Sequence, residues 1–211
     1  RAADQVERFR DKMITGKDSF LQRLNAAEID VEDFGDYLTA LHTHERRVAM
    51  IKKKIEALEA KPETENRASK IAEWKDRLAD KDDTFGSGMS EREASEIKKD
   101  MERERPEITE FAEEYYETVT KAALKIRFEA GLISEETYKT LRDEFKYYVP
   151  LKGLAGEEPA RPGQSRKSGI MTSGIKRAKG RSSQADNPFV QGMVDHTDAI
   201  ARAEQNRVRQ S

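Results

Sequence analysis

The sequence predicts an all-α fold, built from long antiparallel helical hairpins with a coiled-coil-like seam and joined to an irregular basic arm. Apolar residues recur at helical spacing in several stretches, and no stretch shows a credible strand pattern. Charged residues make up 38% of the chain and hydrophobic residues 36%. Because so charged a chain has few residues for a core, we expect each long helix to bury one apolar stripe.

The first segment, residues 1–30, is expected to form short helices. One apolar stripe precedes Gly16 and another follows it, and Asp18 is placed to cap the second helix. The stripe residues are Val6, Phe9, Met13, Phe20, Leu21 and Leu24. Acidic residues between Glu28 and Asp33 then mark the start of the next helix, where negative charge interacts favourably with the helix dipole.

The second segment, residues 31–153, carries the strongest pattern. Two rows of residues with a spacing of seven predict a helix–helix interaction seam of the coiled-coil kind. The seam residues are Phe34, Tyr37, Leu41, His44, Val48, Ile51, Ile55 and Leu58. Pro62 ends this helix, and a shorter stripe that includes Trp74 follows it. The two stretches predict an antiparallel helical hairpin, in which His44 is expected to be a polar seam residue that sets the register.

The rest of this segment is expected to hold three further helices. Ser90 and the glutamate three residues later fit a capping box that opens the first of them. Gly131 favours the left-handed backbone of a C-cap after the second helix, and Ser134 caps the third. Pro150 then forces an extended exit. We expect the hairpin of residues 106–153 to organise the fold.

The third segment, residues 154–186, is rich in Gly, Ser, Pro, Arg and Lys and is predicted to be an irregular arm. Its candidate nucleic-acid-binding residues are Arg161, Arg166, Lys167, Lys176, Arg177, Lys179 and Arg181. No acidic or aromatic residue lies between the first and the last of them. This composition favours sequence-independent contact with DNA phosphates over base stacking. The alternatives are a solvated loop and a loop paired with the acidic helices.

The last segment, residues 187–211, is predicted to be a helix that begins at Asn187 and Pro188, which suit the N-cap and the first helical position. The sequence stops within a helical pattern, and its first residue is Arg rather than Met. We therefore expect the chain to be a fragment whose last helix continues into a larger protein.

No residue pattern predicts a catalytic, cofactor or metal site. The chain has no cysteine, which excludes disulfides and thiolate chemistry. His42 and His44 project from nearly opposite sides of a helix, so we expect structural roles for both. The acidic residues between Glu110 and Glu117 lack the Glu-x-x-His partner of a di-iron bundle, and we expect a solvated acidic face. No apolar run is long enough to span a membrane.

Four short blocks follow one another along the chain. They are Asp36-Tyr-Leu-Thr-Ala-Leu-His42 with Glu45-Arg46; Gly86-Ser-Gly-Met-Ser90 with Glu93-Ala94; Gly131-Leu-Ile-Ser-Glu-Glu-Thr-Tyr138 leading to Tyr147-Tyr-Val-Pro-Leu-Lys-Gly153; and Ala185-Asp-Asn-Pro188 with Ala199-Ile-Ala-Arg-Ala203 and Asn206-Arg-Val208. In this order they resemble a helical module found in large polyvalent proteins of phages, plasmids and integrating elements. Between Arg46 and Gly86 the chain departs from that module with a longer Lys- and Glu-rich hairpin.

The resemblance implies a context rather than a chemistry. Such proteins are very long and join helical linker modules to helicase-like, methyltransferase-like, peptidase or transglycosylase segments. Some are packaged in the phage particle and enter the host with the DNA. No catalytic motif of that family carries over to a residue of this sequence.

The resulting expectation is a non-enzymatic structural and interaction module, part of an internal virion or ejection protein. It would contact other copies of itself or neighbouring virion proteins inside the phage particle, with its basic arm against packaged DNA, and needs no cofactor. One alternative is an antirestriction or DNA-maintenance factor that binds DNA non-specifically in the bacterial cytoplasm. Another is a linker or regulatory segment of a large multidomain enzyme.

Overall fold

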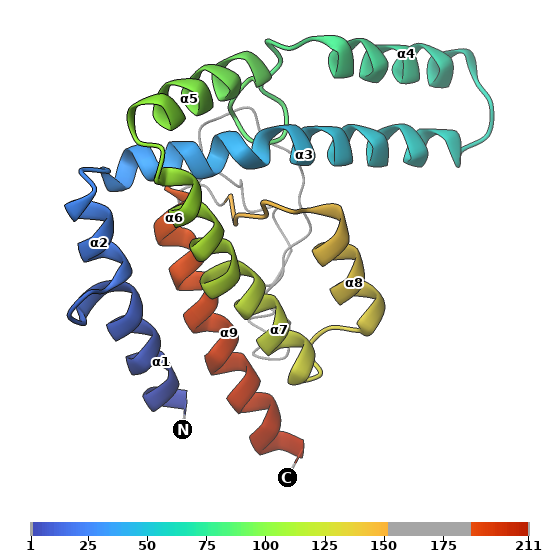
Figure 1. Ribbon diagram of the computed structural model, residues 1–211. Coiled ribbons are helices and arrows are strands. Elements are labelled where there is room, and N and C mark those ends of the chain that lie inside the picture. The colour runs from blue at the N-terminus through green and yellow to red at the C-terminus, as the bar shows by residue number, and fades with distance from the viewer. Residues whose placement is uncertain (1, 152–186, 211) are drawn as a thin grey trace, which may run out of the picture.

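The computed structural model describes residues 2–151 and 187–210, and throughout these residues the regular structure is helical (Figure 1). This confirms the predicted all-α fold class. The segment 154–186, with the seven basic residues from Arg161 to Arg181, lies outside the described residues.

The helices of the described residues are joined by segments of different lengths. In chain order they are α1 Ala2–Arg10, the π-helical η1 Asp11–Thr15, α2 Phe20–Ala26, α3 Val31–Glu59, α4 Glu65–Ala79, α5 Glu91–Glu104, α6 Ile108–Tyr115, the π-helical η2 Tyr116–Lys121, α7 Ala122–Glu129, α8 Glu135–Glu144 and α9 Pro188–Gln210.

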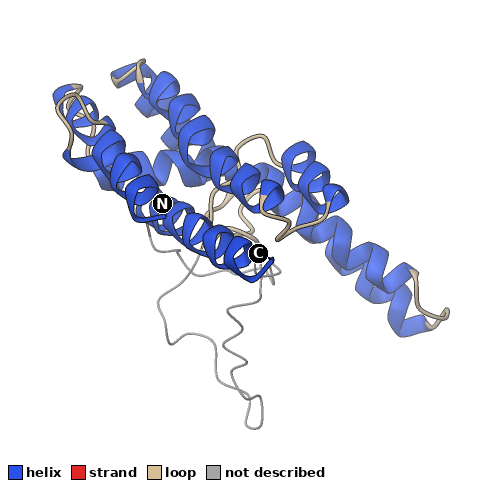
Figure 2. Ribbon diagram, turned by 90° about the horizontal axis from the view of Figure 1, so that it is seen from below, coloured by secondary structure: helices blue, strands red, loops and turns tan. Residues whose placement is uncertain are grey.

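The 29-residue helix α3, about 43 Å long, is the axis of the arrangement. α5 packs along its first half and α4 along its second half, both antiparallel to it (Figure 1). α6, η2 and α7 form one continuous helix that crosses α3, and α9 lies between this helix and α1. The outer half of the α3–α4 hairpin projects from this body in both views (Figures 1 and 2).

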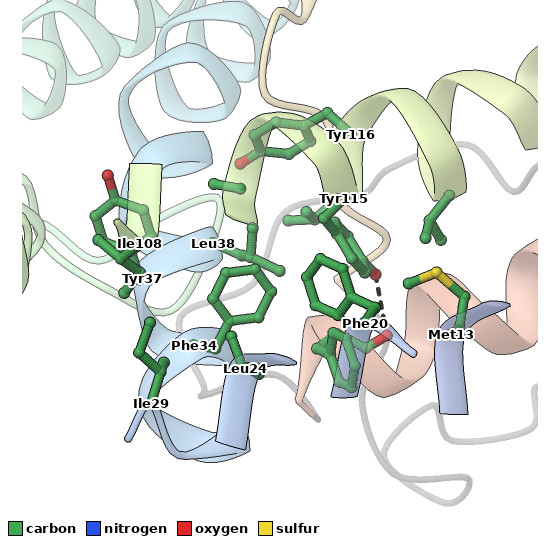
Figure 3. Packing of buried hydrophobic residues seen from close by; sticks show 14 of the residues in the cluster. Met13, Phe20, Leu24, Ile29, Phe34, Tyr37, Leu38, Ile108, Tyr115 and Tyr116 are labelled. Atoms are coloured by element: carbon green, nitrogen blue, oxygen red, sulfur yellow. Dashed lines mark hydrogen bonds between the residues drawn. The ribbon is translucent and has the colours of Figure 1, made fainter. Parts of the chain in front are cut away.

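The main hydrophobic core combines residues from distant parts of the chain (Figure 3). The Phe20 ring in α2 lies 5.7 Å from Phe34 in α3 and 5.8 Å from Phe189 in α9, measured between ring centroids. These three residues belong to the segments 1–30, 31–153 and 187–211, so the described parts of all three share one core. α8 has no buried residue, so the 106–153 hairpin contributes to this core through its first helix and through Val149 of the exit segment.

Local chemistry sets most helix ends as the sequence predicts. The Ser90 and Ser134 side chains accept hydrogen bonds from backbone N–H groups three residues later, and α9 begins at Pro188 after Asn187. Gly131 has φ +67°, and the next N–H bonds to the Arg127 carbonyl, as in a Schellman cap. The prediction for Asp18 is wrong, because Ser19 supplies the cap of α2 through its hydroxyl.

The coiled-coil seam of α3 is not confirmed as a continuous feature. Phe34, Tyr37 and Ile51 are buried, but the His44 side chain is 72% exposed and bonds to Glu91. The remaining seam residues, Leu41, Val48, Ile55 and Leu58, are only partly buried. The reason is that α3 changes partners along its length, from α5 and α9 to α4, so the buried face does not keep one heptad register.

The π-helical η2 shifts the buried stripe of the α6–α7 helix. Tyr115 and Val119 are buried as a 3.6-residue stripe predicts, but Tyr116 and Thr120 are buried beside them. A π-helical turn holds an extra residue and rotates everything after it. Arg127 is therefore buried in α7, whereas its apolar neighbour Ile126 is only partly buried.

Candidate functional site

A polar junction lies where α3, α7, α9 and residues 145–151 meet. We define it by His42 and Glu45 of α3, Arg127 of α7, Tyr148 of the exit segment and Asp195 of α9. Glu45 accepts a hydrogen bond of 3.1 Å from the backbone N–H of residue 147, and the His42 and Tyr148 ring centroids are 5.7 Å apart. Tyr148 also lies close enough to Arg127 and Asp195 to be influenced by their charges, so all four parts of the chain contribute to one polar site.

His42 is fully buried at this junction. Its ring makes edge contacts with the Phe145 and Tyr148 rings, and neither ring nitrogen has a hydrogen-bond partner among the described residues. The Glu45 carboxylate lies 3.7 Å from Nδ1, beyond hydrogen-bond distance but close enough for electrostatic attraction. Burial lowers the pKa of His42 below its ordinary 6.5, and the opposing attraction of Glu45 does not cancel this effect. The structure therefore favours a neutral His42.

Arg127 and Asp195 form the ionic part of the junction. The guanidinium donates hydrogen bonds of 3.0 and 3.1 Å to the two carboxylate oxygens and another of 3.1 Å to the Asp195 carbonyl. Both side chains are largely buried, so removing one partner would strand a charge away from water. Because two nitrogens of the planar guanidinium bond to the two carboxylate oxygens, the pair fixes the rotation of α9 against α7.

Tyr148 completes the junction as a neutral phenol. Burial is the main reason why its pKa is raised, and the nearby Asp195 carboxylate raises it further. Arg46 and Arg127 act in the opposite direction without reversing the shift. A buried neutral imidazole beside a partly buried neutral phenol is suited to fixing the exit segment on α3.

A second polar site anchors the loop before α5. The Arg47 guanidinium is fully buried and donates a hydrogen bond of 2.8 Å to Glu91, and two more to the carbonyls of Arg77 and Asp80. His44 bonds to the same Glu91 oxygen at 3.0 Å. Burial alone would raise the pKa of Glu91, but the hydrogen bonds from His44 and Arg47 outweigh it and lower the pKa.

The glycine turn within this loop lies directly on α3. Gly86 has φ +113°, and a Cβ atom there would lie 3.3 Å from the Cα atom of Arg47. Its carbonyl accepts a hydrogen bond of 2.6 Å from Arg46, while Ser87 bonds to Thr43 at 3.1 Å. The Gly-Ser-Gly sequence thus serves as a tight turn before the Ser90 cap.

The sequence predicts no role for Arg47, Arg127 and Asp195, although the first two are among the most buried charged side chains described. A signal was present, because Arg47 lies between apolar residues at helical spacing, Ala40 and Met50. The ion pairs themselves depend on tertiary partners in α5 and α9. The predicted acidic face pairs in part with basic residues, since Glu114 binds Arg23 at 2.6 and 2.9 Å.

Two surface grooves lie away from the polar junction. One, of about 590 Å³, runs between α3 and α5 beside His44 and Glu91. The other, of about 300 Å³, lies between α3 and α4. Within residues 2–151 and 187–210, no group of three or more His, Asp or Glu side chains is placed to hold a metal ion. No helix in the same ranges combines the length and apolar character needed to cross a membrane.

Comparison with protein-family models, with curated proteins and with solved structures finds no match to this chain.

Proposed function

We propose that this chain is a non-enzymatic structural and interaction module of a large phage or mobile-element protein, an internal virion protein associated with packaged DNA. The observation that carries the proposal is the α3–α4 hairpin, which projects from a core shared by the two end segments and the middle of the chain (Figure 2). A projecting hairpin on a firmly tied core is suited to contact with partner proteins or further copies of the module.

The contacts among the four sequence blocks support the same proposal. Arg46 of the first block bonds to Gly86 of the second, and Glu45 accepts from the backbone N–H of Tyr147 in the third. Asn187 of the fourth block donates to the Val31 carbonyl, just before the first. Blocks that are far apart in sequence thus meet in one structural unit, as expected if they belong to one module.

The outer part of the hairpin has its own small cluster. Ile51 and Phe85 are buried there, and Ile55, Trp74 and Leu78 pack against them. This cluster is separate from the main core, so the hairpin is stabilised without using its outer surface. That surface is available for other molecules, and we place the partners there.

The proposal is tested by mass spectrometry of purified phage particles. Abundant peptides from this chain, extending into flanking sequence of a larger protein, are expected if the module is packaged inside the particle. Absence from particles, with the chain present in infected cells, would contradict the virion role.

The second candidate is an antirestriction or DNA-maintenance factor in the bacterial cytoplasm. It is favoured by the acid-free basic stretch from Arg161 to Arg181. Replacing its seven basic residues with Gln is expected to remove salt-dependent DNA binding. Binding that persists unchanged would exclude this stretch as the DNA contact.

A further inference from the structure

A lysine groove lies between α3 and α4, toward the outer part of their hairpin, with a volume of about 300 Å³. Its lining residues are Lys54, Ala57, Leu58, Lys61, Lys70 and Trp74. Ala57 and Leu58 lie three and four residues after Lys54 on one face of α3, and Lys61 follows Leu58 by three residues, just beyond the C-terminal end of the helix. Lys70 and Trp74 are four residues apart on the facing side of α4.

The charge of the lysine groove is uncompensated. Lys54, Lys61 and Lys70 are exposed, and none of them forms an ion pair with another residue in the part of the chain that the structure describes. No carboxylate lines the groove. A concave surface with one sign of charge concentrates ions of the opposite sign, so the groove favours an anionic ligand.

Trp74 gives the lysine groove an aromatic wall. Its ring centroid lies 5.0 Å from that of Phe85, which ties it to the hairpin cluster. The Lys54 ammonium lies 5.9 Å from the centroid of the same ring. Because Lys54 is exposed and flexible, it can turn toward a phosphate while a base takes its position beside the indole.

We infer that the lysine groove binds single-stranded nucleic acid, through its phosphates and one base stacked on Trp74. Lys54 and the C-cap residue Ala60 are separated by about 9 Å along the axis of α3, at about 1.5 Å per residue, and Lys61 is the next residue. Three nucleotides of a stacked strand cover about 10.2 Å, at about 3.4 Å each. The carboxylates of an acidic peptide could pair with the same lysines, but they do not stack on an indole ring as a base does. Nucleic acid is therefore the favoured ligand.

This inference deepens the proposed association with DNA, and it places a contact outside the segment 161–181. The test uses the fluorescence of Trp74, which is the single tryptophan of the chain. A short oligothymidylate, titrated into the 211-residue chain at about 50 mM salt, is expected to quench this fluorescence as a base stacks on the indole.

The decisive variant is K54Q/K61Q/K70Q, which removes the three charges while keeping similar side-chain size. Each single-strand phosphate contact contributes about 0.7 to the slope of log K against log salt, so the slope is expected to fall by about 2. In the unchanged protein, these three contacts alone weaken oligonucleotide binding about 18-fold as the salt concentration rises from about 50 to about 200 mM. The variant will not show this part of the salt dependence. The K17Q/K52Q/K99Q variant is the matched control, since it changes exposed lysines elsewhere by the same total charge.

The outcomes separate the lysine groove from the basic stretch. Quenching that survives Gln substitution of the seven basic residues from Arg161 to Arg181, but is lost in K54Q/K61Q/K70Q, supports the inference. Binding of a labelled oligonucleotide without any change in Trp74 fluorescence overturns it and leaves the proposed DNA association standing. No binding at all contradicts both. Quenching by polyglutamate and not by oligothymidylate also overturns it, in favour of an acidic protein partner.

Discussion

The contact between Tyr115 and Gly192 ties α9 to the C-terminal end of α6 and gives a sharp test of the fold. Tyr115 is fully buried, and its hydroxyl lies 3.0 Å from the carbonyl oxygens of Pro188 and Phe189, to which it donates (Figure 3). A Cβ atom at Gly192 would lie 1.9 Å from the Tyr115 hydroxyl oxygen. The two groups cannot coexist without movement of α9.

The perturbation is Gly192→Ala, alone and combined with Tyr115→Phe. Overpacking costs about 1–3 kcal/mol, and Ala gains about 1 kcal/mol over Gly in a helix. Since the Tyr115 ring is fixed by its neighbours, we expect a net loss of about 2 kcal/mol from the upper end of that range. In the Tyr115→Phe background the colliding oxygen is absent and the nearest ring carbon is 3.0 Å away. There the same change is expected to be neutral within about 1 kcal/mol.

The assay is urea unfolding of the four proteins of this double-mutant cycle, followed by circular dichroism. A coupling of about 2 kcal/mol corresponds to a factor of about 30 in the folded-to-unfolded ratio. Ala201→Gly, at an exposed position of α9, is the control and is expected to cost about 1 kcal/mol in both backgrounds. Additive effects of the Tyr115 and Gly192 changes would refute the described docking of α9.

Three further predictions concern the polar contacts. Arg127→Leu removes the guanidinium from the largely buried Asp195 and is expected to destabilise the fold by about 3–5 kcal/mol in urea unfolding. Most of this loss should be recovered in R127L/D195L, because no charge is then left without a partner. An equal loss in the double variant would contradict a specific ion pair. Asn187→Ala removes the α9 cap and the bond to Val31, and a loss of about 1–2 kcal/mol is expected, whereas an unchanged urea midpoint would count against this anchor. Burial lowers the pKa of His42 and of His196, so the unfolded chain binds more protons than the folded chain below pH 6.5. The free energy of unfolding should therefore fall as pH decreases below 6.5, by up to about 1.4 kcal/mol per pH unit for each histidine. Urea titrations at successive pH values should show a smaller slope for H42L. An unaltered slope would contradict the neutral buried state of His42.

The caps illustrate what the sequence could predict. Ser90, Ser134, Gly131 and Asn187 act within a few residues of their own positions, so their chemistry is visible in the sequence. The predicted cap at Asp18 was wrong, because Asp18 and Ser19 are both common capping residues and only the backbone geometry decides which of them caps α2.

The interior of the fold was less predictable. The heptad spacing on α3 does not reveal that α4 covers only its second half, and this change of partner leaves His44 exposed and buries His42. The extra residue of the π-helical turn likewise rotates the buried face of α7 so that it includes Arg127. A prediction that assumes a constant helical period does not place Arg127 on that face. The lysine groove needs residues from two helices, and neither helix alone distinguishes those lysines from other solvated charges.

The placement of α9 argues for a unit with one fixed register. An apolar stripe alone allows a helix to slide by one turn, about 5.4 Å, because the next residues of the stripe replace the first. Polar contacts cannot be replaced in this way, since each donor must meet its own acceptor. Such contacts are spread along the helix and join Asn187 to Val31, Asp195 to Arg127, His196 to Val119 and Asn206 to Ala130. A slide would strand all of them, so α9 holds the core in one arrangement from which the α3–α4 hairpin projects in a defined direction.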